Sequence, residues 1–262
     1  MRRLLAAAGV LAALAPVQVG AATPVSPPDV PMTVAMRDVP PLVDVATGDP
    51  VAAPPFLPRP ERGTRLATVR RGRSVPLRAG PGGRVLVSAD SSTEFGSRTI
   101  LSVARERGRW LGVRSPDLLD DRLGWVDRRS HALTLDRTGY SIVADLSRRR
   151  VELLRGDRVT RRLPVAIGRP ESPTPTGRYA VTDELAGTDF ASSYGCCIIA
   201  LSGHQRKLPA GWQGGDRLAL HGTDAPATVG TEASAGCLRA DDGAVRALMR
   251  RVPLGTPVRI KR

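Results

Sequence analysis

Short runs of alternating apolar and polar residues, separated by glycine-rich turns, characterise the chain from about residue 63 onward. In the first part, such runs cover 99–104, 110–113 and 123–126. Several short strands at this spacing predict a small β-barrel over 63–135. Trp110 and Trp125 lie in two of these runs, where they either fill the core of the barrel or line a binding groove.

A second unit, 139–262, continues the strand pattern and then changes period once. The runs at 141–145 and 150–154 flank a basic turn and predict a hairpin. Further strands are expected at 163–167, 179–182, 197–201, 218–220 and 257–260. A short helix is expected to begin near Asp241 or Asp242 and to end before Pro253, because one apolar stripe is formed by Val245, Leu248, Met249 and Val252. The expected fold class is therefore mainly β.

The first 22 residues have the features of a signal peptide. Arg2 and Arg3 precede an apolar stretch that ends at Val17, and small residues follow it. This stretch is shorter than the ~20 residues that span a membrane core, and an uncleaved anchor is the alternative. Residues 23–62 contain almost half of the 23 prolines and predict a disordered linker. We therefore expect an exported protein that acts in the cell wall or elsewhere outside the cytoplasm.

The charge balance bears on the partners. The chain has 262 residues, 39 basic and 25 acidic side chains, and a net charge of +14 at pH 7. Export argues against nucleic acid as the partner and favours an anionic wall polymer or lipid surface. No glycine-rich phosphate loop ends in Lys-Ser or Lys-Thr, so we expect no nucleotide and no other cofactor. We also expect a monomer.

Three cysteines are too few for a disulfide scaffold, and their odd number leaves at least one thiol free. Cys196 and Cys197 are adjacent, so their Cα atoms are ~3.8 Å apart and a bridge between them would be strained. Cys197 opens an apolar run, which favours a packing role. A zinc site could be imagined from this pair with His204 and His221, but no paired metal-binding motif is present and we expect no metal. His204 and His131 are expected to be surface or structural residues.

His221 and Cys237 could form a nucleophilic pair. His221 ends an apolar run, and a loop of this length can return Cys237 to it. The histidine would take the proton of the thiol, and the positive charge, Arg239 and the nearby helix N-terminus are expected to lower the thiol pKa. Amides around Gly236 and Cys237 could stabilise an oxyanion. From spacing alone, a buried cysteine and an unrelated histidine remain an equal alternative.

The motif His221-Gly222-Thr223, followed by Ser234-x-Gly236-Cys237-x-Arg239, resembles the signature of the L,D-transpeptidase catalytic domain, the YkuD-like family. The segments 168–177 and 253–258 resemble two further family motifs. The resemblance implies a β-sandwich-like domain over 139–262 with a short helix after the nucleophile. Many members have histidine where this chain has Ala235. The segment 63–135 resembles the bacterial Src-homology-3-like domains of exported wall enzymes through 77–81 and 124–126.

By this resemblance, Cys237 is the nucleophile and His221 is the base and later the acid. The carbonyl of Gly222 orients the imidazole. We assign substrate binding to Arg239, Gly236, Ser234 and Thr223. The implied activity is an acyltransferase that cross-links peptidoglycan stem peptides through a cysteine thioester. A secreted cysteine amide hydrolase, such as an L,D-carboxypeptidase, and a non-catalytic wall-binding protein are the alternatives.

Overall fold

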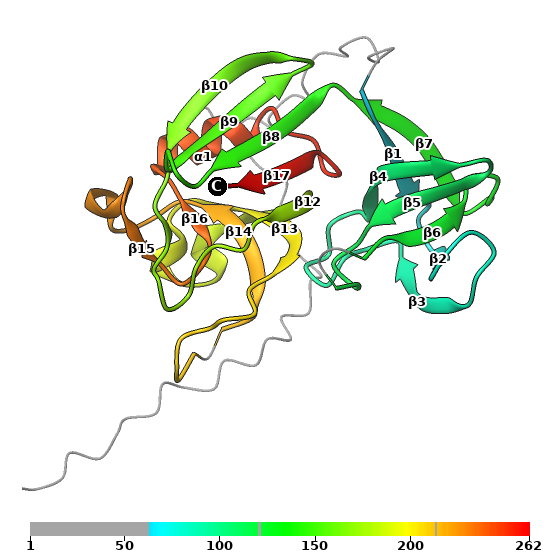
Figure 1. Cartoon of the computed structure of the whole chain (residues 1–262), viewed down its shortest axis with the longest axis horizontal. Coiled ribbons are helices and arrows are strands. Elements are labelled where there is room, and N and C mark those ends of the chain that lie inside the picture. The colour runs from blue at the N-terminus through cyan, green and yellow to red at the C-terminus, as the bar shows by residue number, and fades with distance from the viewer. Residues whose placement is uncertain (1–62, 120–121, 213) are drawn as a thin grey trace, which may run out of the picture. The chain divides into compact units, whose positions relative to one another are not determined.

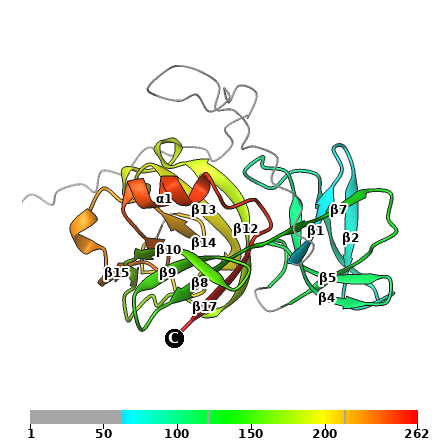
Figure 2. The same ribbon diagram turned by 90° about the horizontal axis from the view of Figure 1, so that it is seen from above.

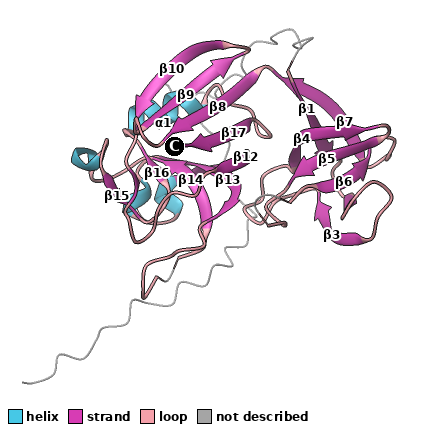
Figure 3. Cartoon of the chain, in the orientation of Figure 1, coloured by secondary structure: helices cyan, strands magenta, loops and turns pink. Residues whose placement is uncertain are grey.

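A computed structural model describes residues 63–119, 122–212 and 214–262. The predicted signal peptide and proline-rich linker lie outside these ranges. All the described residues belong to one compact unit, Ala52–Arg262. Strands dominate them and helices are short, as Figure 3 shows, which confirms the mainly β fold class. Within these ranges no helix is long and apolar enough to span a membrane.

The first seven strands form one antiparallel sheet in the order β3-β2-β6-β5-β4-β1-β7. Their bounds are β1 (Thr64–Val69), β2 (Ser74–Arg78), β3 (Val85–Asp90), β4 (Ile100–Arg107), β5 (Trp110–Arg114), β6 (Gly124–Asp127) and β7 (Leu133–Thr138). The sheet covers the predicted barrel segment and continues three residues past its expected end. Trp125 is 7% exposed and therefore mostly buried, whereas Trp110 is half-buried. The likeness to Src-homology-3 domains stays a prediction.

The remaining strands form an eight-stranded sheet in the order β10-β9-β8-β17-β12-β13-β14-β16 and a two-stranded sheet, β11-β15. Their bounds are β8 (Tyr140–Asp145), β9 (Arg150–Arg155), β10 (Arg158–Pro164), β11 (Ile167–Gly168), β12 (Gly177–Ala186), β13 (Cys197–His204), β14 (Arg217–His221), β15 (Glu232–Ser234), β16 (Leu238–Arg239) and β17 (Pro257–Lys261). Figure 1 shows β10, β9, β8 and β17 side by side. The predicted hairpin is the β8–β9 pair.

The predicted helix is α1 (Asp242–Met249), which lies along β13 in Figure 2. The side chain of Asp241 caps it by accepting a hydrogen bond from the amide of Ala244 at 3.2 Å. Its buried face packs into the core of the eight-stranded sheet through Val245 and Leu248. The helix stops before Val252, which the apolar stripe had included but which is buried in the turn that follows. The 3₁₀ turns η1 (Gly187–Asp189), η2 (Ser192–Tyr194) and η3 (Pro226–Thr228) complete the described helices.

One parallel strand pair brings the two halves of the histidine–cysteine motif together. The register of β14 and β16 places His221 opposite Arg239 and Leu220 opposite Leu238. Cys237 directly precedes β16, so this register brings it beside Ala219, two residues before His221 on β14. The pairing of β14 with β16 therefore brings Cys237 close to His221, whereas the length of the intervening loop only makes this approach possible.

The adjacent cysteines are bonded to each other, a possibility that the sequence left open. A disulfide joins Cys196 and Cys197, whose Cα atoms are 3.8 Å apart. Cys196 lies before β13 begins at Cys197, so the alternation of side chains along a strand does not separate the two sulfurs. Cys197 is also buried, as predicted. Among the described cysteines, Cys237 has the free thiol.

Candidate active site

The imidazole of His221 is held in one orientation. His221 ends β14 and is 3% exposed. Its Nδ1 lies 2.6 Å from the carbonyl oxygen of Gly222. A carbonyl can only accept, so Nδ1 carries the proton and donates it, which leaves the lone pair on Nε2. The ring of Tyr194 lies beside the imidazole, with centroids 4.8 Å apart. The backbone therefore selects the tautomer that a base at Nε2 needs.

The thiol of Cys237 lies in the same cavity as His221. Its Sγ is 3.8 Å from the carbonyl oxygen of Arg217, a contact in which the thiol donates. The cavity has a volume of about 30 Å³. Besides these two residues, the side chains around it include Tyr194, Gln205, Trp212, Ala235 and Arg239. A nucleophile and a base thus line one small cavity.

Burial keeps both members of the pair neutral. Burial raises the pKa of the Cys237 thiol above its usual range, although a backbone hydrogen bond at Ala219 and the charge of Arg239 lower it. The expected net lowering of the thiol pKa is therefore wrong, because desolvation outweighs Arg239. Burial also lowers the pKa of His221 to about 4; Arg239 adds to this, while the Gly222 carbonyl and the charge of Asp242 oppose it. Near neutral pH the pair is a thiol and an uncharged imidazole.

Asp242 positions the loop after His221, a role that sequence reasoning missed. One carboxylate oxygen accepts from the amide of Thr223 at 3.0 Å, and the other accepts from the amide of Cys196 at 3.0 Å. A Cβ on Gly222 would lie 2.1 Å from the first oxygen. Glycine is therefore required at Gly222 by the close approach of Asp242. In the sequence this aspartate had only the signature of a helix start.

The loop that carries the Cys237 thiol is held in place by hydrogen bonds between its own residues. Ser234 is fully buried; its hydroxyl donates to the carbonyl of Cys237 at 2.6 Å and accepts from the amide of Gly236 at 3.0 Å. The Gly236 amide, proposed as an oxyanion donor, is thus already engaged. Gly236 has a φ of +121°, and a Cβ there would lie 1.9 Å from Nε2 of Gln205. The loop conformation therefore requires glycine at this position.

Gln205 is a second residue that the sequence did not single out. Its side chain is 4% exposed, and its amide nitrogen donates to the carbonyls of Pro173 at 3.0 Å and Ala235 at 3.2 Å. Its oxygen accepts from the amide of Lys207. It thereby ties the upstream motif to the thiol loop. An isolated glutamine in a turn-rich segment gives no pattern from which this role could be predicted.

The predicted substrate-binding residues fall into two groups. Arg239 lines the cavity, and its Nε is buried without a hydrogen-bond partner among the described residues. Gly236, Ser234 and Thr223 are buried and serve the loops themselves. Thr223 donates its amide to Asp242, and its hydroxyl accepts from the amide of Ala225 at 3.1 Å. Of these four, only Arg239 both lines the cavity and has a buried polar atom without a hydrogen-bond partner among the described residues.

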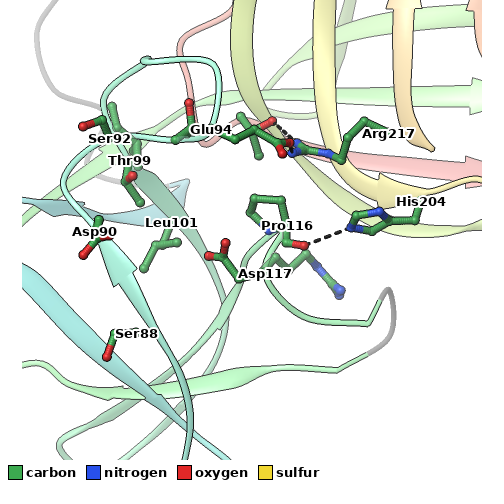
Figure 4. A pocket seen from close by; sticks show the side chains of 14 residues that line it. Ser88, Asp90, Ser92, Glu94, Thr99, Leu101, Pro116, Asp117, His204 and Arg217 are labelled. Atoms are coloured by element: carbon green, nitrogen blue, oxygen red, sulfur yellow. Dashed lines mark hydrogen bonds and ion pairs between the residues drawn. The ribbon is translucent and has the colours of Figure 1, made fainter. Parts of the chain in front are cut away.

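Arg217 connects the thiol to the first sheet. Its Nη2 donates to the hydroxyl of Thr182 and to the carbonyl of Leu201, both at 2.7 Å. Its Nη1 forms an ion pair with Glu94, which lies between β3 and β4 (Figure 4). The carbonyl of the same residue contacts Cys237. The neighbouring cavity, about 320 Å³, is lined by polar side chains of both sheets.

Three aromatic rings lead from the same β3–β4 segment to the imidazole. Phe95 meets Phe190 edge to face at 6.1 Å, and Phe190 meets Tyr194 in the same way at 6.1 Å. Tyr194 then packs on His221. Aromatic residues make up only 3% of the chain, so their concentration here is informative. The orientation of the imidazole is therefore supported from the first sheet as well as by Gly222.

The imagined zinc set does not assemble. Cys196 and Cys197 are joined in a disulfide, so neither provides a thiolate. His204 binds Asp216 through Nδ1 and the carbonyl of Pro116 through Nε2, both at 2.9 Å. Within the described ranges no three His, Cys, Asp or Glu side chains form a group that could hold a metal ion.

Residues 139–260 match the sequence model of the YkuD family, described as the L,D-transpeptidase catalytic domain. This part of the chain is therefore similar to L,D-transpeptidase catalytic domains. The YkuD protein of Bacillus licheniformis is 27% identical over 125 residues, which are 48% of this chain and 67% of that protein. The YkuD protein of Bacillus subtilis is 28% identical over 123 residues, 47% and 66% of the two chains. The L,D-transpeptidase match therefore covers about half of this chain and about two thirds of these relatives.

Solved structures of L,D-transpeptidases are also similar. One from Mycobacterium tuberculosis is 21% identical, with a TM-score of 0.37 over 53% of this chain and 72% of that one. One from Mycobacterium smegmatis is 12% identical, with a TM-score of 0.40 over 74% of this chain and 99% of that one. The likeness to L,D-transpeptidase catalytic domains rests on the sequence model and the two Bacillus relatives.

Proposed function

We propose that this protein is a peptidoglycan L,D-transpeptidase that forms a thioester on Cys237. One observation carries the proposal: an imidazole whose Nδ1 is held by the Gly222 carbonyl shares a small cavity with a free thiol, in the part of the chain that matches the L,D-transpeptidase family model. The donor is a stem peptide that ends in D-alanine. The acceptor is an amine on a neighbouring stem.

The first half-reaction breaks the amide before the terminal D-alanine. Sulfur of Cys237 attacks the amide carbonyl carbon while its proton passes to Nε2 of His221. The tetrahedral intermediate collapses when the C–N bond breaks, and Nε2 gives the proton to the departing amine. The products are free D-alanine and a thioester between Cys237 and the third stem residue. Since both groups begin neutral, charge develops only during the transfer.

The second half-reaction restores the thiol. The acceptor amine attacks the thioester carbonyl and loses a proton to Nε2 of His221. The C–S bond then breaks, an amide joins the two third residues, and the sulfur recovers the proton from the imidazole. Water in place of the amine would give a carboxypeptidase by the same steps. A sulfur nucleophile suits both halves because it attacks well and leaves well.

Arg239 is the residue we propose to contact the substrate. It lines the cavity, and its buried Nε, which has no partner among the described residues, is costly unless a ligand uses it. A carboxylate of the stem peptide would satisfy it through a charge-assisted hydrogen bond. The charge of Arg239 also lowers the pKa of both Cys237 and His221. Arg239 therefore favours the thiolate form of Cys237 as it loses its proton, and it disfavours a His221 imidazole that stays protonated.

Export is part of the proposal, because the substrate lies outside the cytoplasm. The predicted signal peptide over 1–22 and linker over 23–62 would deliver the folded unit and allow it to reach the wall.

Intact-protein mass spectrometry tests the proposal. The full chain is incubated with a carbapenem, which acylates the sulfur of this family as the resemblance implies, beside Cys237→Ala. We expect one adduct on the unaltered protein and none on the variant. An unmodified protein in both samples would favour a wall-binding role without catalysis. A tetrapeptide donor with an amine acceptor then separates transfer, which yields a cross-linked dimer, from hydrolysis, which yields only the tripeptide.

A further inference from the structure

Two arginines face each other on the outer face of the eight-stranded sheet. Register places Arg178 of β12 directly opposite Arg259 of β17. Both side chains are exposed, while the neighbours Tyr179, Val258 and Ile260 point into the core. Like charges directly opposite on a sheet repel each other and destabilise it. The pair therefore needs an explanation other than the stability of the fold.

Two carboxylates on this face are engaged elsewhere. The same cross-strand row continues from Arg259 to Val143 and then to Glu152. Glu152 forms ion pairs with Arg150 at 2.9 Å and with Arg162 at 3.0 Å. In the described part of the chain, neither Arg178 nor Arg259 forms an ion pair.

The second carboxylate, Asp145, is equally occupied. It lies two residues after Val143 on the same face of β8, and it pairs with Lys261 of β17. Lys261 donates to it at 2.5 Å, and the hydroxyl of Ser147 donates at 2.7 Å. Arg148 lies 3.9 Å away as a further cation. These two carboxylates therefore balance other cations and form no ion pair with Arg178 or Arg259.

The pair belongs to a larger basic groove. An open hollow of about 920 Å³ is lined by five arginines, which we call the arginine groove: Arg105, Arg114, Arg122, Arg178 and Arg259. No Asp or Glu occurs among the described residues that line it. Hydroxyl groups of Thr64, Ser102 and Ser141 add hydrogen-bonding groups along it. An open hollow lined by charges of one sign concentrates a ligand of the opposite sign.

We propose that the arginine groove binds a phosphodiester-linked anionic polymer. Guanidinium groups pair with phosphate oxygens in a two-pronged geometry, and arginines on facing strands are close enough to contact one phosphate or successive ones. An open groove accommodates a chain better than a small molecule. Identification of the polymer as one of the cell wall rests on the proposed function. Binding of a polyphosphate chain does not rest on it.

Binding of inorganic polyphosphate to the full chain, measured by titration calorimetry at several salt concentrations, tests this proposal. The variant Arg178→Gln with Arg259→Gln removes the facing pair. The control is Arg158→Gln with Arg161→Gln, which removes the same charge from exposed positions of β10 outside the groove. We expect the groove variant to bind about tenfold more weakly and the slope of log affinity against log salt to fall by about 1 to 2. The control should change less than about twofold.

Three results would overturn the proposal. Equal weakening in both variants would mean that net charge alone attracts the polymer. Stronger binding to poly-glutamate would exclude phosphate as the recognised group. Stronger binding to phosphatidylglycerol vesicles would make the surface a lipid contact.

Two further measurements separate this site from the fold and from the active site. The groove variant should unfold at the same temperature as the unaltered protein or slightly higher, because a repulsive pair is removed. Its rate of carbapenem acylation should not change, since neither arginine lines the Cys237 cavity. Loss of acylation without loss of polyphosphate binding in Cys237→Ala would show that the two proposals stand independently.

Discussion

Asp242→Asn is the substitution that tests most directly how the loop after His221 is held. In the unaltered protein each carboxylate oxygen accepts a backbone amide, from Thr223 and from Cys196, at 3.0 Å. Asparagine keeps one oxygen and turns an NH₂ group toward the other amide. One hydrogen bond to a charged acceptor is lost, worth about 1.5–3 kcal/mol, and the second becomes a neutral one. We therefore expect the free energy of unfolding to fall by about 2–4 kcal/mol.

The neighbouring carboxylate supplies the control. Asp241 caps α1 through the amide of Ala244, and asparagine is nearly as good as aspartate at a helix N-cap. Urea unfolding of Asp241→Asn should therefore agree with the unaltered protein within about 0.5 kcal/mol. If Asp242→Asn lowers the free energy of unfolding by no more than this control does, the role assigned to the Asp242 carboxylate is refuted.

The same variant should also react more slowly with a carbapenem. Gly222, which orients the imidazole, lies against Asp242, so a loop that shifts moves the carbonyl that holds Nδ1 of His221. A displacement of ~1 Å in a catalytic group can lower the rate about 100-fold. The acylation rate at 25 °C is followed by intact mass, in a variant shown to be folded by circular dichroism. An unchanged acylation rate would show that the way Asp242 holds this loop does not affect the reaction of Cys237.

Two other predictions concern the thiol loop and pH. Gly236→Ala should lose acylation and stability, because its Cβ would overlap Gln205. The control is Gly230→Ala: Gly230 has a φ of +89° and no atom within 4 Å of the added Cβ, so this variant should incur only backbone strain of about 1–3 kcal/mol. Equal unfolding free energies for the two variants would contradict this prediction. The acylation rate should be level from about pH 5 to neutrality and fall as pH drops through about 4, because His221 must be neutral to accept the proton from Cys237. A rate that instead falls near pH 6.5 would place the imidazole in a solvated environment.

Local pattern was sufficient for some of the elements but not for others, such as β1, β3 and β7, which it did not predict. Alternation of apolar residues predicted the hairpin at 141–145 and 150–154, which the structure extends only slightly to Tyr140–Asp145 and Arg150–Arg155. The apolar stripe and the capping aspartate placed the start of α1. These features depend on neighbours within a few residues, so the sequence contains the necessary information. The motif around His221 and Cys237 likewise identified the candidate pair.

Tertiary structure decided the state of that pair and the residues that hold it. The parallel register of β14 and β16, between residues distant in sequence, brings Cys237 back to His221. Burial, a property of the whole core, reversed the expected direction of the thiol pKa. Asp242 and Gln205 act on loops far along the chain, and no local pattern marks such contacts. Sequence alone therefore determined which groups could react, and packing determined their protonation and orientation, because both depend on neighbours that only folding brings together.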